Sequence, residues 1–251
     1  MRLGGREGKK HSGSPLFFFC SHSHSYAGNP TILAWDIFNE PEWCVADTKE
    51  ATTAQKLPAA ALQAFIGRAA SIIHSAGGPG SLATVGSASV KWSWEDASTR
   101  PAWCMDLWGD AALVAANGGD PAAFLDFGQT HYYPWMVKEI DPFANAATTY
   151  CPDPVRKPLI IGEAQANLLK QYSAAALARN AHAQGYAGLL YWSYTAVDDK
   201  GGWDDFAGCV GCAGGPPPPP EVAGSAGASI PHAVRPPAEA EKPKRRFFFG
   251  L

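Results

Sequence analysis

Five short apolar runs alternate with helix-like segments through the middle of the chain. Runs of this length without polar alternation are typical of parallel strands that are buried on both faces. Strands that alternate with helices predict a parallel sheet with right-handed crossover connections. The strands predicted in this way are Thr31–Asn39, Leu82–Ser87, Leu125–Tyr132, Pro158–Glu163 and Gly188–Tyr194.

The clearest helix is predicted to start at Pro58, because proline suits the first helical turn, and to end at Gly77-Gly78. Apolar residues recur in it at three- and four-residue spacing and form one apolar face. These are Leu62, Phe65, Ile66, Ala69, Ile72 and Ile73. A second helix is predicted at Asn167–Gln184, and less regular crossovers are predicted within 101–117 and 134–149. The order of elements is therefore βαβαβαβαβ.

The two ends of the chain differ from this middle region in composition. Residues 1–25 are rich in Gly, Ser and His and are predicted to form an irregular, low-complexity leader. Its apolar run, Leu16–Cys20, is shorter than the roughly 7 to 15 residues of a signal-peptide core, so no working signal is expected. Residues 208–251 include Pro216–Pro220 and are predicted to be a disordered tail rich in Pro, Gly and Ala. The remaining region, 26–207, is the predicted globular unit.

The overall composition limits the kinds of partner that the chain is expected to bind. A net charge of −3 gives no electrostatic basis for binding nucleic acid or an anionic membrane surface. An apolar stretch of about 18 residues, the minimum for a membrane-spanning helix, is lacking. Six cysteines occur, and only Cys209-Val-Gly-Cys212 forms a short motif. Without a second such pair a zinc site is not expected, and buried thiols and disulfides remain equally open.

Two glutamates each close a buried strand. Glu40 ends the run that contains Trp35, and Glu163 ends the run that begins at Pro158. In a barrel of parallel strands the active site lies at the carboxyl ends of the strands, so a polar residue at that point indicates catalysis. The alternative for either glutamate alone is a helix cap or an ion pair with arginine, and that alternative has about even weight.

Two further strand ends carry residues that can act on a substrate. His131 and Tyr133 lie at the end of the third predicted strand, and alternate side chains share one strand face, so both are expected to point into the site. Trp192 lies near the end of the last predicted strand. Four strand ends thus supply an acid, a His/Tyr pair, a second acid and a tryptophan, a set much more specific than any member.

These motifs together resemble those of clan A glycoside hydrolases. The segment Trp35-Asp-Ile-Phe-Asn-Glu-Pro41 is similar to their strand-four signature, and His131-Tyr-Tyr133 to their strand-six motif. Lys157-Pro-Leu-Ile-Ile-Gly-Glu163 resembles the strand-seven nucleophile segment, and Trp192 the strand-eight tryptophan. The spacing suits family 5 and its β-mannanase and cellulase relatives. The resemblance implies a TIM (β/α)8 barrel of which strands four to eight are present.

The resemblance also implies a reaction and a role for each residue. A retaining enzyme would cleave a β-1,4-linked polysaccharide, mannan or cellulose, with Glu40 as general acid/base and Glu163 as nucleophile. Asn39 would bind the sugar 2-hydroxyl, Tyr133 would orient Glu163, and His131 would contact substrate or Glu40. Neither a metal nor a cofactor is implied, and family likeness predicts secretion. The nearness of the two carboxyl groups predicts an ionised Glu163 and a raised pKa for Glu40.

Strands one to three of such a barrel are not recognisable before Tyr26. A partial barrel is expected to expose apolar strand edges, which predicts self-association or poor solubility. Two other functions therefore stay open. One is an inactive carbohydrate-binding remnant that keeps Trp192 and Trp135; the other is an unrelated α/β barrel enzyme whose glutamate pair is accidental.

Overall fold

The protein is described by a computed structural model that divides the chain into two units, Met1–Gly215 and Pro216–Leu251. All described residues belong to the first unit. They are residues 22–49, 51–78, 80–133, 141, 145–151, 157–165, 173–193, 195 and 201–206. The predicted tail, the Cys209–Cys212 motif and Trp135 lie outside these residues, as does the predicted leader up to residue 21; residues 22–25 form a helical turn.

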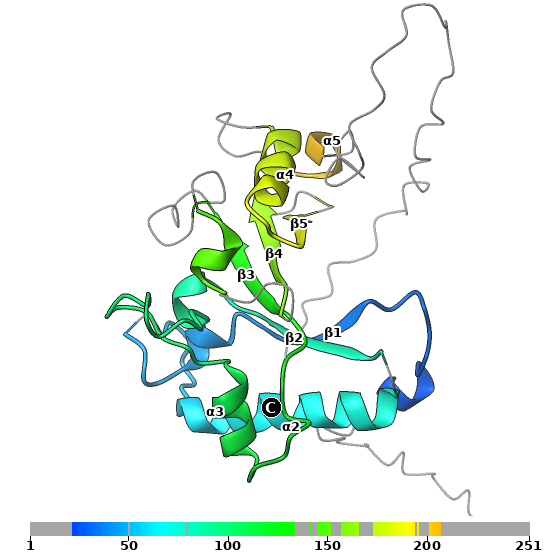
Figure 1. The fold of residues 1–251 in the computed structure, drawn as a ribbon, viewed down its shortest axis with the longest axis vertical. Coiled ribbons are helices and arrows are strands. Elements are labelled where there is room, and N and C mark those ends of the chain that lie inside the picture. The colour runs from blue at the N-terminus through cyan, green and yellow to red at the C-terminus, as the bar shows by residue number, and fades with distance from the viewer. Residues whose placement is uncertain are drawn as a thin grey trace, which may run out of the picture. The chain divides into compact units, whose positions relative to one another are not determined.

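Five parallel strands form the framework of the described region (Figure 1). They are β1 (Ala34–Asn39), β2 (Leu82–Gly86), β3 (Gly128–Tyr132), β4 (Leu159–Gln165) and β5 (Gly188–Trp192). β1 pairs with β2, and β3–β4–β5 form a second ladder. A parallel bridge between Ser87 and Thr130 links the two ladders, so the strands follow one another in chain order. This confirms all five predicted strands and the parallel α/β architecture.

Helices follow the strands as the sequence predicts. They are α2 (Ala59–Gly77), α3 (Asp110–Ala116), α4 (Ala174–Ala183) and α5 (Trp203–Phe206), together with the 3₁₀ turns η1 (Pro41–Cys44), η2 (Val90–Trp92) and η4 (Ala147–Thr149). The predicted helix after Pro58 is confirmed. Of the predicted helix Asn167–Gln184, the structure describes α4, whose N-cap Ser173 accepts a hydrogen bond from the backbone N–H of Ala176. Of the crossover predicted within 134–149, residues 134–140 and 142–144 lie outside the described residues.

The long helix α2 anchors the first half of the sheet. Its apolar face packs on β1 and β2, and α3 lies beside it (Figure 1). Ile66, Ala69 and Ile73 of this face are fully buried. Each isoleucine contributes roughly 1.5–3 kcal/mol by leaving water. The helix ends before Gly78, whose φ of 75° is a left-handed conformation that glycine adopts without steric cost.

A second core packs β3, β4 and β5 against α4. Its fully buried members include Ile161 of β4 and Leu177 of α4, with Tyr150 and Tyr186 nearly so. The sheet thus has α2 and α3 against its first strands and α4 against its last. Both cores hold the strands firmly, so that the residues at their carboxyl ends keep fixed positions.

The outer strands of the described region are less covered. Among the strands that the structure describes, β1 and β5 each pair with one neighbour. Leu33, just before β1, is 77% exposed, and Leu190 of β5 is 57% exposed. Within the described residues, none of the helices is long and apolar enough to cross a membrane. The described cysteines Cys44, Cys104 and Cys151 are reduced thiols.

Candidate active site

Glu40 follows β1 directly and has an unusual backbone conformation. Its φ and ψ are 47° and 54°, in the left-handed region, which costs a non-glycine residue about 1–2 kcal/mol. Its backbone N–H donates to the carbonyl oxygen of Gly86, at 2.6 Å. Pro41 then opens η1. The chain turns sharply at the end of the strand, and this turn aims the carboxyl group of Glu40 across the strand ends.

The carboxyl group of Glu40 is held at both oxygens. Its Oε2 accepts a hydrogen bond from Nε1 of Trp43 at 2.8 Å. Its Oε1 lies 2.7 Å from Nδ1 of His131, which is 1% exposed on β3. Burial by itself raises the pKa of Glu40, but the hydrogen bonds from His131 and Trp43 outweigh it and hold this pKa below its ordinary value.

Glu163 lies on β4, two residues before the strand ends. Its Oε2 accepts a hydrogen bond from the hydroxyl of Tyr133 at 2.6 Å and lies 3.5 Å from Nδ1 of His131. A side-chain hydrogen bond with Asn39 also reaches it. Burial raises the pKa of Glu163 above its ordinary value. The charge of His131 and the hydrogen bond from Tyr133 offset this rise only in part.

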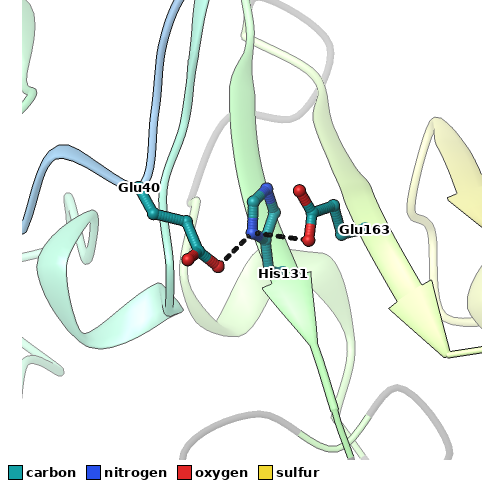
Figure 2. Close-up of side chains that lie close together, drawn as sticks. All are labelled: Glu40, His131 and Glu163. Carbon is teal, nitrogen blue, oxygen red and sulfur yellow. Dashed lines mark hydrogen bonds and ion pairs between the residues drawn. The ribbon is translucent and has the colours of Figure 1, made fainter. Parts of the chain in front are cut away.

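Figure 2 shows His131 between the two carboxyl groups, which come from opposite sides. The nearest donor and acceptor atoms of Glu40, His131 and Glu163 all lie within 4.8 Å of one another. Retaining glycosidases place their carboxyl groups about 5–5.5 Å apart, whereas inverting enzymes need roughly 6.5–9.5 Å to admit a water molecule. The closest atoms of the two carboxyl groups in this protein lie nearer together than the range of the inverting enzymes.

Comparison with known proteins gives relatives of one kind. The mannan endo-1,4-β-mannosidase of Mytilus edulis is 28% identical over 181 residues, which are 65% of this chain and 47% of that protein. The chain is related to the clan A glycoside hydrolases. The similarity is to the mannanases of this clan, and the chain spans about half the length of the relatives it matches. None of the protein-family models matches the chain.

Solved structures show the same fold. The β-mannanase from the blue mussel Mytilus edulis superposes with a TM-score of 0.61 at 24% identity, over 74% of this chain and 54% of that one. The β-1,4-mannanase of the sea hare Aplysia kurodai gives 0.59 at 22% identity, over 72% and 54%. The predicted barrel class is thereby confirmed, with the described strands forming part of such a barrel.

The order of the two pKa values differs from the expectation. The nearness of the two carboxyl groups predicts a raised pKa at Glu40 and an ionised Glu163, whereas the pKa of Glu40 is lowered and that of Glu163 is raised. The reason is the position of His131, whose Nδ1 lies nearer to Glu40 than to Glu163. Burial therefore dominates at Glu163, whereas at Glu40 the hydrogen bonds from His131 and Trp43 outweigh it.

The remaining predicted residues lie around this pair. Asn39 is the last residue of β1, and its side chain reaches Glu163. Trp192 ends β5, pairs in register with Gln165 of β4 and is 39% exposed. The peptide bond between Trp192 and Ser193 is cis. All six residues named from the sequence therefore lie at the carboxyl ends of β1, β3, β4 and β5.

Sequence reasoning missed several residues of the site. Trp43 donates to Glu40, and only its closeness to the Asn-Glu-Pro segment hinted at a role. Gln129 donates through Nε2 to Asp36 at 3.1 Å, which joins β3 to β1 below the carboxyl pair. Gly162 leaves room for the side chain of Gln129, because an added Cβ would lie 1.8 Å from its Oε1.

Gly86, whose carbonyl oxygen accepts from the backbone N–H of Glu40, shows the same close approach to neighbouring side chains. An added Cβ would lie 3.0 Å from Oδ1 of Asn39 and 3.2 Å from Nε2 of His131. The strand ends thus meet tightly at this point, and a glycine is required on β2 for Asn39 and His131 to keep their positions.

Among the residues that the structure describes, Glu40, His131 and Glu163 are also the group whose atoms lie close enough to ligate a metal ion. Histidine and carboxylate ligands suit zinc and similar ions. Two of the same carboxylate oxygens also accept hydrogen bonds, from Trp43 at Glu40 and from Tyr133 at Glu163. The family resemblance implies no metal at this position, and that implication stays a prediction.

Proposed function

We propose that this chain carries the catalytic face of a retaining glycoside hydrolase that cleaves β-1,4-linked mannan by double displacement. The observation that carries the proposal is the pair Glu40 and Glu163, within 4.8 Å on separate parallel strands with His131 between them. Mannan is favoured over cellulose because the relative and the structural neighbours bear mannanase names.

In the first step, Glu163 is the nucleophile. One of its oxygens attacks the anomeric carbon while Glu40 donates its proton to the glycosidic oxygen, and the bond between that carbon and oxygen breaks. The hydrogen bond from Tyr133 to Oε2 fixes the attacking carboxylate, and holding it in a reactive position removes part of the entropic barrier. The products are a shortened glycan and a glycosyl ester on Glu163.

In the second step, water replaces the leaving glycan. Glu40, now ionised, removes a proton from the water, whose oxygen attacks the anomeric carbon and releases Glu163. Two inversions give net retention of configuration. A lowered pKa of Glu40 suits this step, because an ionised carboxylate is required as the base.

The first step needs a protonated Glu40, and His131 offers a way to provide it. If Nδ1 of His131 carries no hydrogen, a protonated Glu40 can donate to it across the same 2.7 Å contact. Burial raises the pKa of Glu163, and in this step Glu163 must be ionised to act as the nucleophile. We assign the proton to Glu40 once a glycosidic oxygen binds beside it.

Two further residues are proposed to bind the sugar. Asn39 directly precedes Glu40 and its side chain is hydrogen-bonded to Glu163, so we propose that its amide reaches the 2-hydroxyl of the ring under attack. Trp192 exposes part of its ring at the end of β5, and an indole face is a suitable platform for a pyranose ring. Both would strengthen binding without taking part in proton transfer.

The test is hydrolysis of mannan, of cellulose and of an aryl β-mannoside by the full chain and by Glu163→Gln. We expect the wild type to release sugar from mannan and the variant to lose at least about a thousandfold in kcat, because the nucleophile is gone. Asp96→Asn is the matched control, since it makes the same acid-to-amide change at a residue of the exposed loop after η2.

The other outcomes separate the alternatives. Binding of mannan without turnover by the wild type would support the inactive carbohydrate-binding protein. Turnover that Glu163→Gln leaves unchanged would show that another pair of residues is responsible and that the glutamate pair is accidental.

A further inference from the structure

Glu42 is a fully buried carboxyl group that the proposed mechanism does not use. It is the second residue of η1, with 0% exposure, and lies between Pro41 and Trp43. Carboxylates are seldom fully buried without partners, because removing the charge from water is costly. Burial raises the pKa of Glu42 above its ordinary value. Such a group needs an explanation from its contacts.

Three donors from two other segments converge on this carboxyl group. Oε1 accepts hydrogen bonds from the hydroxyl of Ser87 at 2.7 Å and from Nε1 of Trp108 at 2.6 Å. Oε2 accepts a hydrogen bond from the backbone N–H of Ala88 at 3.0 Å. Glu42 therefore ties η1 to the residues that directly follow β2 and to the loop before α3.

The residues that follow β2 are themselves in contact with the active site. The carbonyl oxygen of Gly86 accepts from the backbone N–H of Glu40, and that of Ser87 accepts from the backbone N–H of His131 at 3.0 Å. One short segment, 86–88, therefore holds the backbone of Glu40, the backbone of His131 and the side chain of Glu42. Displacing η1 from this segment would change the contact between Glu40 and His131.

The left-handed backbone of Glu40 makes such an anchor necessary. A strained non-glycine residue keeps its conformation only when its surroundings fix it from several sides. On the amino side, β1 and the bond to Gly86 fix Glu40. On the carboxyl side the chain enters η1, where Glu42 supplies the buried bonds to Ser87, Ala88 and Trp108.

We propose that Glu42 is a positioning residue that clamps η1 to the end of β2 and thereby holds Trp43 and Glu40 in their reactive arrangement. Trp43 is the next residue of η1, and its indole N–H reaches Oε2 of Glu40. The effect of Glu42 on turnover rests on the proposed function, whereas its effect on the Trp43–Glu40 contact does not.

The test uses the Trp43 indole N–H as a reporter in the full chain. Its ¹H–¹⁵N signal, assigned by loss in Trp43→Phe, should titrate with Glu40 because the two groups are hydrogen-bonded. In Glu42→Leu all three bonds are lost. We expect the midpoint of the titration of the Trp43 signal, which reports the ionisation of Glu40, to rise by about one pH unit. The reason is that a loosened Trp43 stabilises the ionised Glu40 less. Glu42→Gln keeps an acceptor for two of the donors and should give a smaller rise in the same direction.

The direction of the shift separates this role from others. Removing a nearby negative charge would lower the midpoint, so a fall would show that Glu42 acts by its charge and would overturn the proposal. An unchanged midpoint in both folded variants would overturn it too. Ile73→Val, which removes one methyl group from the buried face of α2, is the control for general destabilisation and should leave the midpoint unchanged.

Turnover gives the second readout. If mannan is hydrolysed, we expect kcat to fall about tenfold in Glu42→Gln and roughly a hundredfold in Glu42→Leu, with little change in KM. Should Glu42→Leu fail to fold, Ser87→Ala removes one of the three bonds and should raise the Trp43 midpoint less than the other variants. A shifted midpoint in a chain that never hydrolyses mannan would contradict the proposed function and leave the positioning role standing.

Discussion

His131 and His74 each form a close contact with a carboxylate, yet the two pairs lie at opposite ends of the parallel strands. Nδ1 of His131 is 2.7 Å from Glu40, and Nε2 of His74 is 2.9 Å from Asp126. His131 is 1% exposed and faces a second carboxylate, Glu163. His74, on α2, meets one carboxylate, and its other ring nitrogen lies 2.8 Å from the carbonyl oxygen of Ala122.

The difference shows that two similar histidine–carboxylate contacts can have different roles. Asp126 also accepts from the backbone N–H of Ala83, so the His74 pair joins α2, β2 and the segment before β3 into one unit. It has the features of a structural contact. His131 contacts two carboxyl groups, Glu40 and Glu163, and so we propose a catalytic role for this pair and a structural role for the other.

Among the changes that separate the two histidine pairs, removing His131 should have the largest effect. In His131→Asn, Glu40 loses the hydrogen bond that lowers its pKa, and Glu163 loses a favourable charge, so both pKa values should rise. We expect kcat on mannan to fall about a hundredfold and both limbs of the pH–rate profile to move to higher pH. Unmoved limbs would contradict the role given to His131. The profile of kcat/KM against pH is the measurement.

Gly86→Ala should lower both stability and turnover, because Gly86 lies against the residues around His131. The new methyl group would press on Asn39 and His131, at 3.0 and 3.2 Å, and we expect a loss of about 1–3 kcal/mol in the free energy of unfolding. Turnover per folded molecule should fall as well, because both neighbours belong to the site. Urea unfolding together with kcat measures the two effects. A stability loss with normal turnover would place Gly86 with the structural contacts.

His74→Gln should reduce stability by about 1–2 kcal/mol at low pH and leave turnover unchanged. Burial alone would lower the pKa of His74, but the bonds to Asp126 and Ala122 raise it above its ordinary value. A raised pKa means that the pair stabilises fully below the unfolded value, about 6.5, and less as pH rises through the folded value. Urea unfolding at pH 5 and pH 9 should therefore show a smaller difference between variant and wild type at pH 9.

The smallest effect is expected at Asp106, a carboxylate with too few donors. Burial and the charge of Glu95 raise its pKa to about 6. The folded protein then holds a proton that the unfolded chain releases near pH 4, so this residue costs stability as pH rises from about 4 to 6. Asp106→Asn should raise the free energy of unfolding at pH 7 by about 1 kcal/mol. An unchanged or lower stability in chemical denaturation would contradict this.

The sequence predicted the strands well because their apolar runs are continuous and short. Glu163 was expected to end its strand, whereas β4 continues to Gln165, since the backbone pairs with β5 beyond Glu163. The helix after Pro58 was predictable from the spacing of its apolar residues, which all face β1, β2 and α3.

What the sequence could not supply are contacts between distant segments. The order of the two pKa values depends on a difference of less than one ångström in the distances from His131, which no pattern encodes. The role of Gly86 depends on Asn39 and His131 meeting over it. Glu42 looked like one more polar residue after Pro41, and only its burial beneath Ser87 and Trp108 sets it apart.

Trapping the covalent glycosyl–enzyme intermediate would identify the nucleophile. A 2-deoxy-2-fluoro-β-mannosyl fluoride slows both steps, because the fluorine destabilises the oxocarbenium-like transition state, while the fluoride leaving group keeps the first step the faster one. The full chain is incubated with it, digested and analysed by mass spectrometry. We expect one sugar adduct on the peptide that contains Glu163, and none in Glu163→Gln. An adduct on Glu40 or another residue, or hydrolysis of aryl β-mannoside with inverted configuration, would contradict it.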